Sequence, residues 1–309
     1  MNKRRIQERF IKIFNEWAES ITDKDVRELV HSNSIITGGA ITSLLQNKEP
    51  KDYDIYFTNK ETTLAVANYY VNALNMKAGH EVAKVFDGHR YLAELGKYPE
   101  WDEINHDDTW WFSEKAYNMA KDRVRIFIKS SGVVRDFEPK EKADKKKKPE
   151  RFRPVFFSSN AITLSDKIQL INRFYGEPES IHDTFDFLHT FNYWRSDSKE
   201  LVLNVDALEA ILDKRLVYKG SRYPLCSVIR VRKFLKRGWT INAGQILKMC
   251  YQLSELDLSD IEVLEDQLIG VDTAYFSDLI SRIQLEISSN EDFKIDETVV
   301  AKLVDEIFG

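Results

Sequence analysis

One short stretch near the N-terminus limits the fold more than any other part of the sequence. Ser34–Ile41 is an apolar run that contains Gly38-Gly39, and residues 40–46 follow a helical pattern. Glu49–Lys51 breaks that helix, and acidic and apolar residues then alternate through Asp52–Phe57, as on a strand with one buried face. A strand, a glycine turn, a helix and a second strand therefore follow one another, which favours a mixed sheet with helices packed on it.

The alternating strand carries two carboxylates on one side. Asp52 and Asp54 are two positions apart, so both face the same way, while Tyr53 and Ile55 face the core. Paired carboxylates on a rigid strand suit a two-magnesium site, because Mg²⁺ prefers hard oxygen ligands. Glycines at a helix entry let backbone N–H groups approach phosphate oxygens. Either feature is common alone, and their order makes the combination informative.

The rest of the chain separates into a mixed first part and a helical second part. Strands are expected at 124–128, 133–137, 154–157, 161–164, 168–174 and 185–189. Helices are expected at 3–20, 58–75, 206–216, 225–237, 243–254, 258–268, 272–287 and 296–308, and residues 177–180 open a further short helix. The sequence thus predicts an α+β fold: a domain at 1–200 with a Trp- and Lys-rich insertion near 80–153, then a helical domain at 201–309.

Charge and cysteine content exclude several classes of protein. The formal charge of −5 argues against a surface that coats nucleic acid throughout, though not against a local basic groove. Cys226 and Cys250 cannot by themselves form a disulfide framework or a four-ligand zinc site. No apolar run approaches the ~20 residues that span a bilayer. A cytoplasmic protein is the expectation.

Two segments of the insertion each allow two interpretations. The acidic residues 102–108, beside Trp101, Trp110 and Trp111, could bind a cation or form a solvated loop. Residues 140–153 hold eight basic and three acidic residues. That segment is either a solvated lysine loop or a contact, through Lys145–Lys148, for the phosphates of RNA or another polyanion.

The order of Gly38-Gly39, a helix and Asp52-Tyr53-Asp54 resembles the signature of the polymerase-β-like nucleotidyltransferase superfamily, which includes CCA-adding enzymes and poly(A) polymerases. The chain also resembles uncharacterised nucleotidyltransferase-like proteins of large bacteriophages. The matched segments are about residues 34–58 and 161–240. The resemblance implies a nucleotidyltransferase-type mixed β-sheet with flanking helices, followed by a helical domain.

The resemblance also implies a metal site with three acids. Asp52 and Asp54 would hold two Mg²⁺ ions, with Mn²⁺ as a substitute, and a third acid would lie on a later, neighbouring strand. Lys167–Ile171 followed by Phe185-Asp186-Phe187 resembles the stretch that carries this acid in viral members, so Asp186 is the expected third ligand. Asp183 is the competitor, but it falls on an expected helix.

Other residues are assigned to the nucleotide by the same resemblance. Gly38, Gly39 and Ser43 would contact phosphates. Arg230, Lys233 and Arg237 recur at helical spacing and would offset the charge of a triphosphate, although a solvated basic face explains them equally well. The Arg-Asp pair that follows the glycines in CCA-adding enzymes is replaced by Ala40–Ser43, so CCA addition is not expected.

The expected function is Mg²⁺-dependent transfer of a nucleoside monophosphate from a nucleoside triphosphate such as ATP to a hydroxyl of RNA, protein or a small molecule, with release of pyrophosphate. His182 and His189 are expected to be structural, because two-metal transfer needs no histidine base. The alternative is a non-catalytic nucleic-acid-binding protein, using Lys145–Lys148 and the helix at 230–237, or a scaffold. A phage-encoded protein would act in the host cytoplasm.

Overall fold

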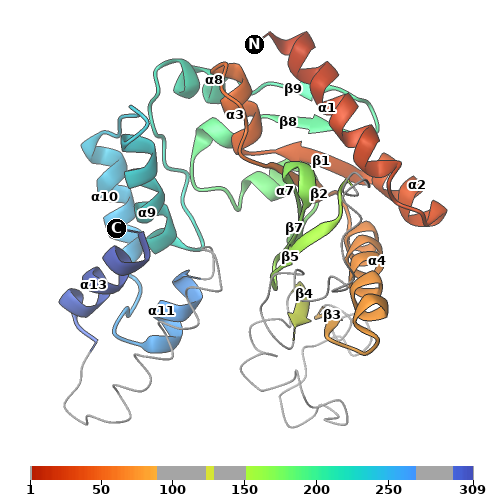
Figure 1. Ribbon diagram of the computed structural model, residues 1–309. Helices are drawn as coiled ribbons and strands as arrows, with labels where there is room; N and C mark the ends of the chain where they lie inside the picture. The colour runs from red at the N-terminus through yellow and green to blue at the C-terminus, as the bar shows by residue number, and fades with distance from the viewer. Residues whose placement is uncertain (1, 89–122, 129–150, 269–294, 309) are drawn as a thin grey trace, which may run out of the picture. The chain divides into compact units, whose positions relative to one another are not determined.

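The computed structural model describes residues 2–88, 123–128, 151–268 and 295–308 (Figure 1). The chain divides into two compact units. The first comprises Met1–Ile181 and Asn192–Leu203, and the second comprises His182–Phe191 and Asn204–Gly309. Several expected features lie outside the described residues, namely Trp101, Trp110, Trp111, the acidic segment 102–108, the strand at 133–137, Lys145–Lys148 and the helix at 272–287.

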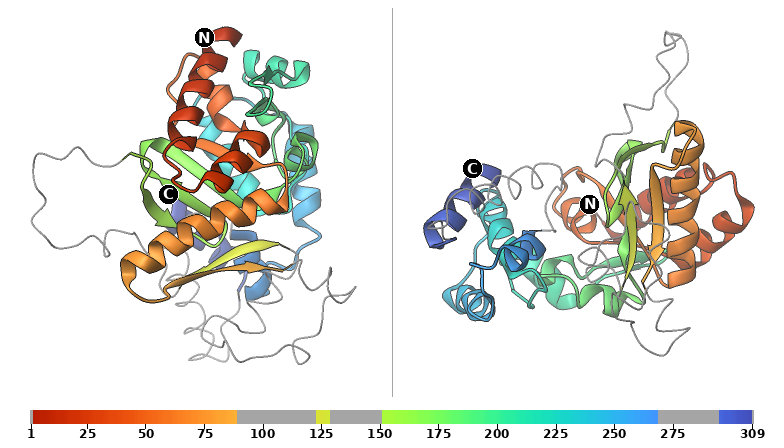
Figure 2. Two further views of the ribbon diagram at one scale, coloured as in Figure 1. Left: turned by 90° about the vertical axis from the view of Figure 1, so that its right-hand side faces the viewer. Right: turned by 90° about the horizontal axis from the view of Figure 1, so that it is seen from below.

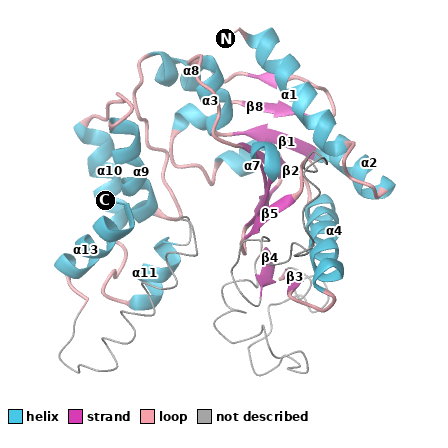
Figure 3. Cartoon of the chain, in the orientation of Figure 1, coloured by secondary structure: helices cyan, strands magenta, loops and turns pink. Residues whose placement is uncertain are grey.

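A seven-stranded mixed sheet forms the centre of the first unit, in the order β5-β6-β7-β2-β1-β8-β9 (Figure 3). The strands are β1 (Ser34–Thr37), β2 (Tyr53–Phe57), β5 (Pro154–Phe157), β6 (Ala161–Leu164), β7 (Ile168–Tyr175), β8 (Tyr193–Arg195) and β9 (Leu201–Val202). β2 and β7 run parallel, and the other neighbours pair antiparallel. β3 (Ala83–Asp87) and β4 (Val124–Ile128) form a separate antiparallel pair.

Helices α1 (Lys3–Ala18), α2 (Lys24–Asn33) and α4 (Lys60–Ala78) pack against one face of this sheet (Figure 2). Apolar side chains from these helices and from alternate strand positions form one buried core. Burial of this apolar surface is the main stabilising contribution, at roughly 25 cal/mol per Å². Three short helical segments connect the strands: α3 (Gly39–Leu45), η3 (Ser165–Lys167) and α7 (Pro178–His182).

Local sequence signals set the helix ends. The side chains of Asn2 and Asn59 accept hydrogen bonds from the Arg5 and Thr62 amides, at 3.0 and 2.8 Å, and so cap α1 and α4. α4 ends at Gly79, whose φ of 74° lies in the left-handed region that glycine adopts without strain. Such caps explain why the expected helices at 3–20 and 58–75 are confirmed to within a few residues.

The second unit is helical in the part that the structure describes. It contains η4 (Leu188–Thr190), α8 (Val205–Leu212), α9 (Pro224–Leu235), α10 (Ala243–Leu253), α11 (Ile261–Leu268) and α13 (Glu297–Phe308). Leu225, Leu264 and Ile295 form a small buried cluster. None of the helices in the described part of the chain combines the length and the apolar character that a membrane span requires.

The α+β class with a mixed sheet and flanking helices is confirmed, whereas the strand expected at residues 185–189 is wrong. Phe187 forms a single isolated bridge to Tyr218, and residues 188–190 form the 3₁₀ helix η4. The alternating apolar residues of 185–189 do not pair in a strand ladder. Phe185 packs on His182, and Phe187 packs on Phe234. The two short strands β8 and β9 were not expected.

Candidate active site

The two carboxylates lie where β1, β2 and β7 meet. Asp54 is opposite Thr37 on β1 and opposite Gln169 on β7. The adjacent row of Ile36, Ile55 and Leu170 faces the helices and belongs to the core. Because side chains alternate across a sheet, the row that contains Asp54 faces the opposite side. Asp52 comes directly before β2, and its charge acts on Asp54.

Both carboxylates are partly buried, and neither has a hydrogen-bond or ion-pair partner within the described part of the chain. Burial, together with the nearby charge of Asp52, raises the pKa of Asp54 from 3.8 to about 7. A partly buried carboxylate without a protein partner is costly for a fold. The arrangement would gain stability from a bound cation.

The residues present fit a magnesium ion that is shared with a nucleotide. Among the described residues, no group of three or more His, Cys, Asp or Glu side chains could enclose a metal. Mg²⁺ in nucleotide sites, however, is usually held by one or two carboxylates, with water and substrate phosphates completing its shell. Asp52 and Asp54 would supply two such ligands to an ion bound here, and the amide oxygen of Gln169, opposite Asp54, would be a further hard donor.

The glycine turn lies beside this pair, because Thr37, opposite Asp54, is followed directly by Gly38. Gly38 has φ 86° and ψ −144°, a conformation that L residues rarely adopt. Gly39 begins α3, and a Cβ added at this residue would meet no heavy atom within 4 Å, so the space above it is open. The Ser43 hydroxyl donates to the Gly39 carbonyl at 2.9 Å, and Ser43 therefore supports the turn.

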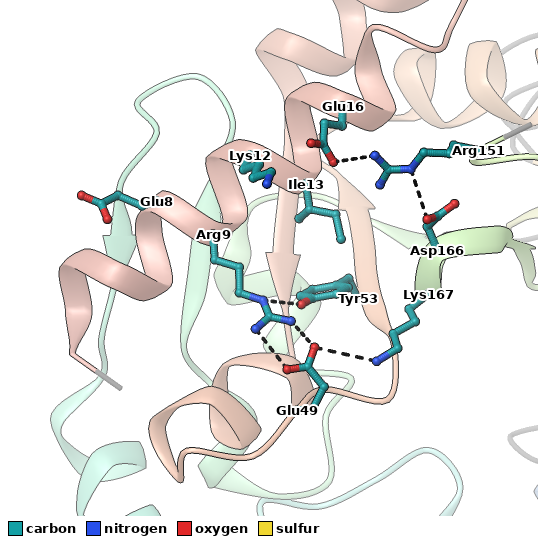
Figure 4. A pocket seen from close by; sticks show the side chains of 10 residues that line it. All are labelled: Glu8, Arg9, Lys12, Ile13, Glu16, Glu49, Tyr53, Arg151, Asp166 and Lys167. Carbon is teal, nitrogen blue, oxygen red and sulfur yellow. Dashed lines mark hydrogen bonds and ion pairs between the residues drawn. The ribbon is translucent and has the colours of Figure 1, made fainter. Parts of the chain in front are cut away.

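A network on the opposite side of β2 holds the segment that leads to Asp52 (Figure 4). Arg9 on α1 donates to the Tyr53 hydroxyl at 2.7 Å and forms a two-pronged ion pair with Glu49. Lys167 donates to the Pro50 carbonyl at 3.2 Å and lies 3.8 Å from Glu49. Residues on both sides of Asp52 are thus tied to α1 and to the start of β7.

The same network lines a pocket of about 590 Å³. A second pair of contacts also belongs to its lining, where Arg151 bridges Glu16 and Asp166 at 3.1 and 3.2 Å (Figure 4). Tyr53 points into this pocket, whereas Asp54 faces the other side of the sheet. The pocket is therefore behind the candidate site rather than part of it. We assign it a positioning role, because Arg9, Arg151 and Lys167 in its lining are already paired with acids of the same lining.

The third expected acid does not lie on a strand next to β2. The strand that runs parallel to β2 is β7, and it presents Gln169 opposite Asp54. Asp186 lies in the second unit, in a bend before η4, where its carboxylate is 2.6 Å from Nη1 of Arg230. The competitor Asp183 lies in the turn after α7. The expected strand position of Asp186 is thus wrong. Its carboxylate pairs instead with Arg230, a residue predicted to bind the triphosphate.

The predicted basic helix is present as α9, but its cations are not on one continuous face. Arg230 and Lys233 lie on α9, whereas Arg237 follows its end at Leu235. The helix ends early because Gly238, with φ 78°, turns the chain back, and its amide bonds the Leu235 carbonyl at 2.9 Å. Lys233 and Arg237 are exposed, and Arg230 is partly covered by its contact with Asp186.

The two histidines are in aromatic surroundings. His182 stacks on Phe191 with ring centroids 4.8 Å apart, and His189 packs on Trp239 at 4.5 Å. Burial lowers the pKa of His189 to about 4, despite the opposing influence of Asp186. Both contacts fit the expected structural role.

Sequence reasoning missed the supporting residues of this site. Gln169 and Arg9 carry no motif, because their importance arises from strand register and from a helix packed 44 residues away in sequence. The run Lys167–Ile171 was the one available signal. It served to locate the acid expected after it, and Gln169 within the run was overlooked. Pairing of β2 with β7 could not be read from a single sequence.

The candidate site and its sheet are contained in a region that matches a known protein family. Residues 8–214 match the model of the Gabija anti-defense 2 family. Because the match covers more than half of the chain, this protein belongs to the Gabija anti-defense 2 family. A curated relative, "Gabija anti-defense 2" of Bacillus phage SPbetaL7, is 22% identical over 276 residues, which cover 89% of this chain and 49% of the relative. The chain spans about half the length of that relative.

Solved structures of tRNA-processing enzymes are also similar, at low scores. The Thermotoga maritima CCA-adding enzyme complexed with tRNA is 12% identical with a TM-score of 0.35, covering 78% of this chain and 45% of that one. A CCA-adding enzyme in an apo form is 10% identical with a TM-score of 0.36, covering 82% and 48%. A tRNA-processing enzyme is 13% identical with a TM-score of 0.36, covering 94% and 61%. Scores of this size carry no weight for the function.

Proposed function

We propose that this protein is a Mg²⁺-dependent nucleotidyltransferase that transfers a nucleoside monophosphate from a nucleoside triphosphate to an acceptor hydroxyl. One observation carries the proposal: two partly buried carboxylates without protein partners among the described residues lie side by side, next to a glycine turn with open space above it. A structural role would leave such a pair as an unrelieved cost to the fold. A metal–nucleotide complex would relieve it.

Each group of residues has a distinct role in the proposed reaction. The acceptor oxygen forms a bond to the α-phosphorus, the bond from that phosphorus to the bridging oxygen breaks, and pyrophosphate leaves while the hydroxyl proton passes to solvent. Asp52 and Asp54 would hold Mg²⁺, which when bound supplies charge stabilisation for the phosphates. The backbone of Gly38 and Gly39, with open space at Gly39, would approach phosphate oxygens.

The proposal retains Ser43 on the strength of the family resemblance. Ser43 would support the phosphate turn through its bond to Gly39. ATP is the nucleotide to test first, and Mn²⁺ is the natural substitute metal.

The proposal includes a biological setting, for which the family name gives support. We propose that the protein serves a phage against Gabija defence in the host cytoplasm, and that the transferred nucleotide marks a macromolecule or small molecule involved in that conflict. The match to a phage relative supports this setting. Because the chain spans about half of that relative, the activity of the longer protein is itself part of the proposal.

The test is a label-transfer experiment. The full chain is incubated with Mg²⁺ and each α-³²P-labelled nucleoside triphosphate, with total RNA, with host protein extract or with a small-molecule extract. We expect label to enter one fraction from one nucleotide, and transfer to disappear with EDTA.

Matched variants make the result specific. Asp52→Asn/Asp54→Asn should lose transfer, whereas Glu28→Gln/Glu81→Gln, which removes the same charge from exposed positions of the first unit, should retain it. Absence of transfer with every nucleotide and fraction, or equal transfer by both variants, would overturn the proposal.

A further inference from the structure

The second unit contains a long segment with one sign of charge. Residues 214–254 hold ten lysine and arginine residues and no aspartate or glutamate, within a chain whose formal charge is −5. This segment is longer than the lysine-rich stretch at 140–153 and, unlike it, lies wholly within the described residues. An asymmetry of this size within one unit indicates an electrostatic function rather than average surface composition.

The fold gathers part of this charge at the end of α9. Two cations, Lys214 and Arg215, come from the loop after α8, and their backbone runs beside Thr240. The Thr240 amide bonds the Lys214 carbonyl at 2.8 Å, and the Leu216 amide bonds the Thr240 carbonyl at 2.8 Å. Thr240 follows the turn that closes α9, so this loop lies next to the helix end. We name the resulting set the cationic cluster: Lys214, Arg215, Arg232, Lys233, Lys236 and Arg237.

All six members of the cationic cluster are exposed. Lys214, Arg215, Lys236 and Arg237 form no ion pair with any residue that the structure describes. Cations in the last turn of a helix are favourable by themselves, because they offset the negative end of the helix dipole. That explanation covers Arg232 and Lys233, but not Lys214 and Arg215, which reach the same place from another segment.

The cluster rests on a rigid base. Trp239, in the turn after α9, is only 4% exposed and packs on Phe234 at 5.6 Å and on His189 at 4.5 Å. α9 and α10 also lie side by side (Figure 1). The buried aromatic contact therefore fixes the backbone that carries the cations at the end of α9. A fixed backbone lowers the entropic cost of binding a ligand.

The composition of the cluster favours phosphates over a protein partner. Half of its members are lysine, a residue depleted in protein–protein interfaces, and no acidic residue breaks the positive run of residues 214–254. Leu212 and Leu235 are exposed nearby and would also suit an acidic protein. Lysine and arginine clusters, however, gain affinity for nucleic acids by displacing the counterions condensed on the phosphate backbone.

We propose that the cationic cluster of the second unit binds the phosphate backbone of a nucleic acid, without base specificity. This binding does not depend on the carboxylate pair of the first unit or on nucleotidyl transfer. A nucleic acid held there would be either the substrate or the location at which the protein acts.

Binding is measured by fluorescence anisotropy on the full chain in EDTA, which removes any contribution of a metal–nucleotide complex. The probes are a labelled 30-nucleotide RNA, a DNA of the same sequence and a poly-glutamate peptide of equal charge, each titrated from 50 to 300 mM NaCl. We expect both nucleic acids to bind with strong salt dependence and the peptide to bind much more weakly.

The variant Lys214→Gln/Arg215→Gln/Lys236→Gln/Arg237→Gln removes four cations of the cluster. Its control, Lys3→Gln/Arg5→Gln/Lys24→Gln/Lys77→Gln, removes the same charge from exposed positions of the first unit. Loss of four phosphate contacts should reduce the slope of log K against log salt by roughly 3 and weaken RNA binding ~10- to 100-fold at 150 mM salt. The control should bind as the wild type does.

Equal RNA binding by the two variants would overturn the proposal, as would an unchanged salt slope in the cluster variant. Poly-glutamate binding as tight as RNA binding would also overturn it, in favour of an acidic protein partner. Circular dichroism establishes that each variant is folded. If the fourfold variant is not, Lys236→Gln/Arg237→Gln, confined to the exposed turn after α9, gives the same test with half the expected change in slope.

Discussion

Replacing Asp54 by asparagine should make the protein more stable above pH 7. Burial and the Asp52 charge raise the pKa of Asp54 from 3.8 to about 7. Relative to the unfolded chain, the folded state therefore favours the protonated form. That preference contributes stability below pH 3.8, and the contribution is lost as the pH rises through 7. Above pH 7 the ionised carboxylate destabilises the folded state by up to about 4 kcal/mol, at 1.36 kcal/mol for each unit of pKa.

Asparagine has nearly the same shape as aspartate but no charge, so Asp54→Asn should remove most of this cost at pH 8 and little of it at pH 4. Asp52→Asn should stabilise less, because the Asp52 charge is the smaller of the two causes. Urea unfolding followed by tryptophan fluorescence measures both effects. Addition of 10 mM Mg²⁺ at pH 8 should stabilise the wild type and leave Asp54→Asn unchanged. If Asp54→Asn is less stable than the wild type at pH 8, Asp54 has a stabilising partner and the reasoning fails.

Three other predictions concern the supports of the two units. Gly38→Ala should destabilise the fold by ~1–3 kcal/mol, because Gly38 has a positive φ. Gly39→Ala should fold normally and lose nucleotide affinity. Thermal unfolding and nucleotide titration distinguish the two variants, and equal stabilities would contradict the strain argument. The folded state keeps His189 neutral with a pKa of about 4, so the unfolded chain takes up a proton first as the pH falls. The free energy of unfolding should therefore fall by up to about 3 kcal/mol between pH 6.5 and 4. His189→Phe should flatten that part of the stability–pH curve, and an unchanged slope would refute this prediction. Arg9→Ala should lower the free energy of unfolding by ~1–2 kcal/mol and speed amide hydrogen exchange at residues 48–52. Tyr53→Phe keeps the contact between Arg9 and Glu49 and should change exchange little. Equal exchange in the two variants would rule out a positioning role for Arg9.

The sequence was sufficient for features that depend on neighbouring residues. Helix caps such as Asn59 and the alternation through Asp52–Phe57 are local signals, so the elements around the candidate site were predicted within a few residues. The side of the sheet on which Asp54 lies followed from strand geometry alone.

Features that depend on contacts between residues far apart in the sequence could not be predicted from the sequence. The segment around Asp186 has strand-like alternation, yet its aromatic side chains pack on different partners and its carboxylate pairs with Arg230, 44 residues further along the chain. The place of Gln169 opposite Asp54 depends on the register between β2 and β7. The joining of Lys214 and Arg215 to the end of α9 likewise depends on a backbone contact that no local pattern encodes.

The central claim is that Asp52 and Asp54 form a metal–nucleotide site, and it can be tested without knowing the acceptor. Mn²⁺ is titrated into the protein, with and without a non-hydrolysable ATP analogue, and free Mn²⁺ is followed by electron paramagnetic resonance. We predict that the wild type and Glu28→Gln/Glu81→Gln bind Mn²⁺ more tightly when the nucleotide is present, and that Asp52→Asn/Asp54→Asn does not. Equal Mn²⁺ binding by all three proteins would contradict the account.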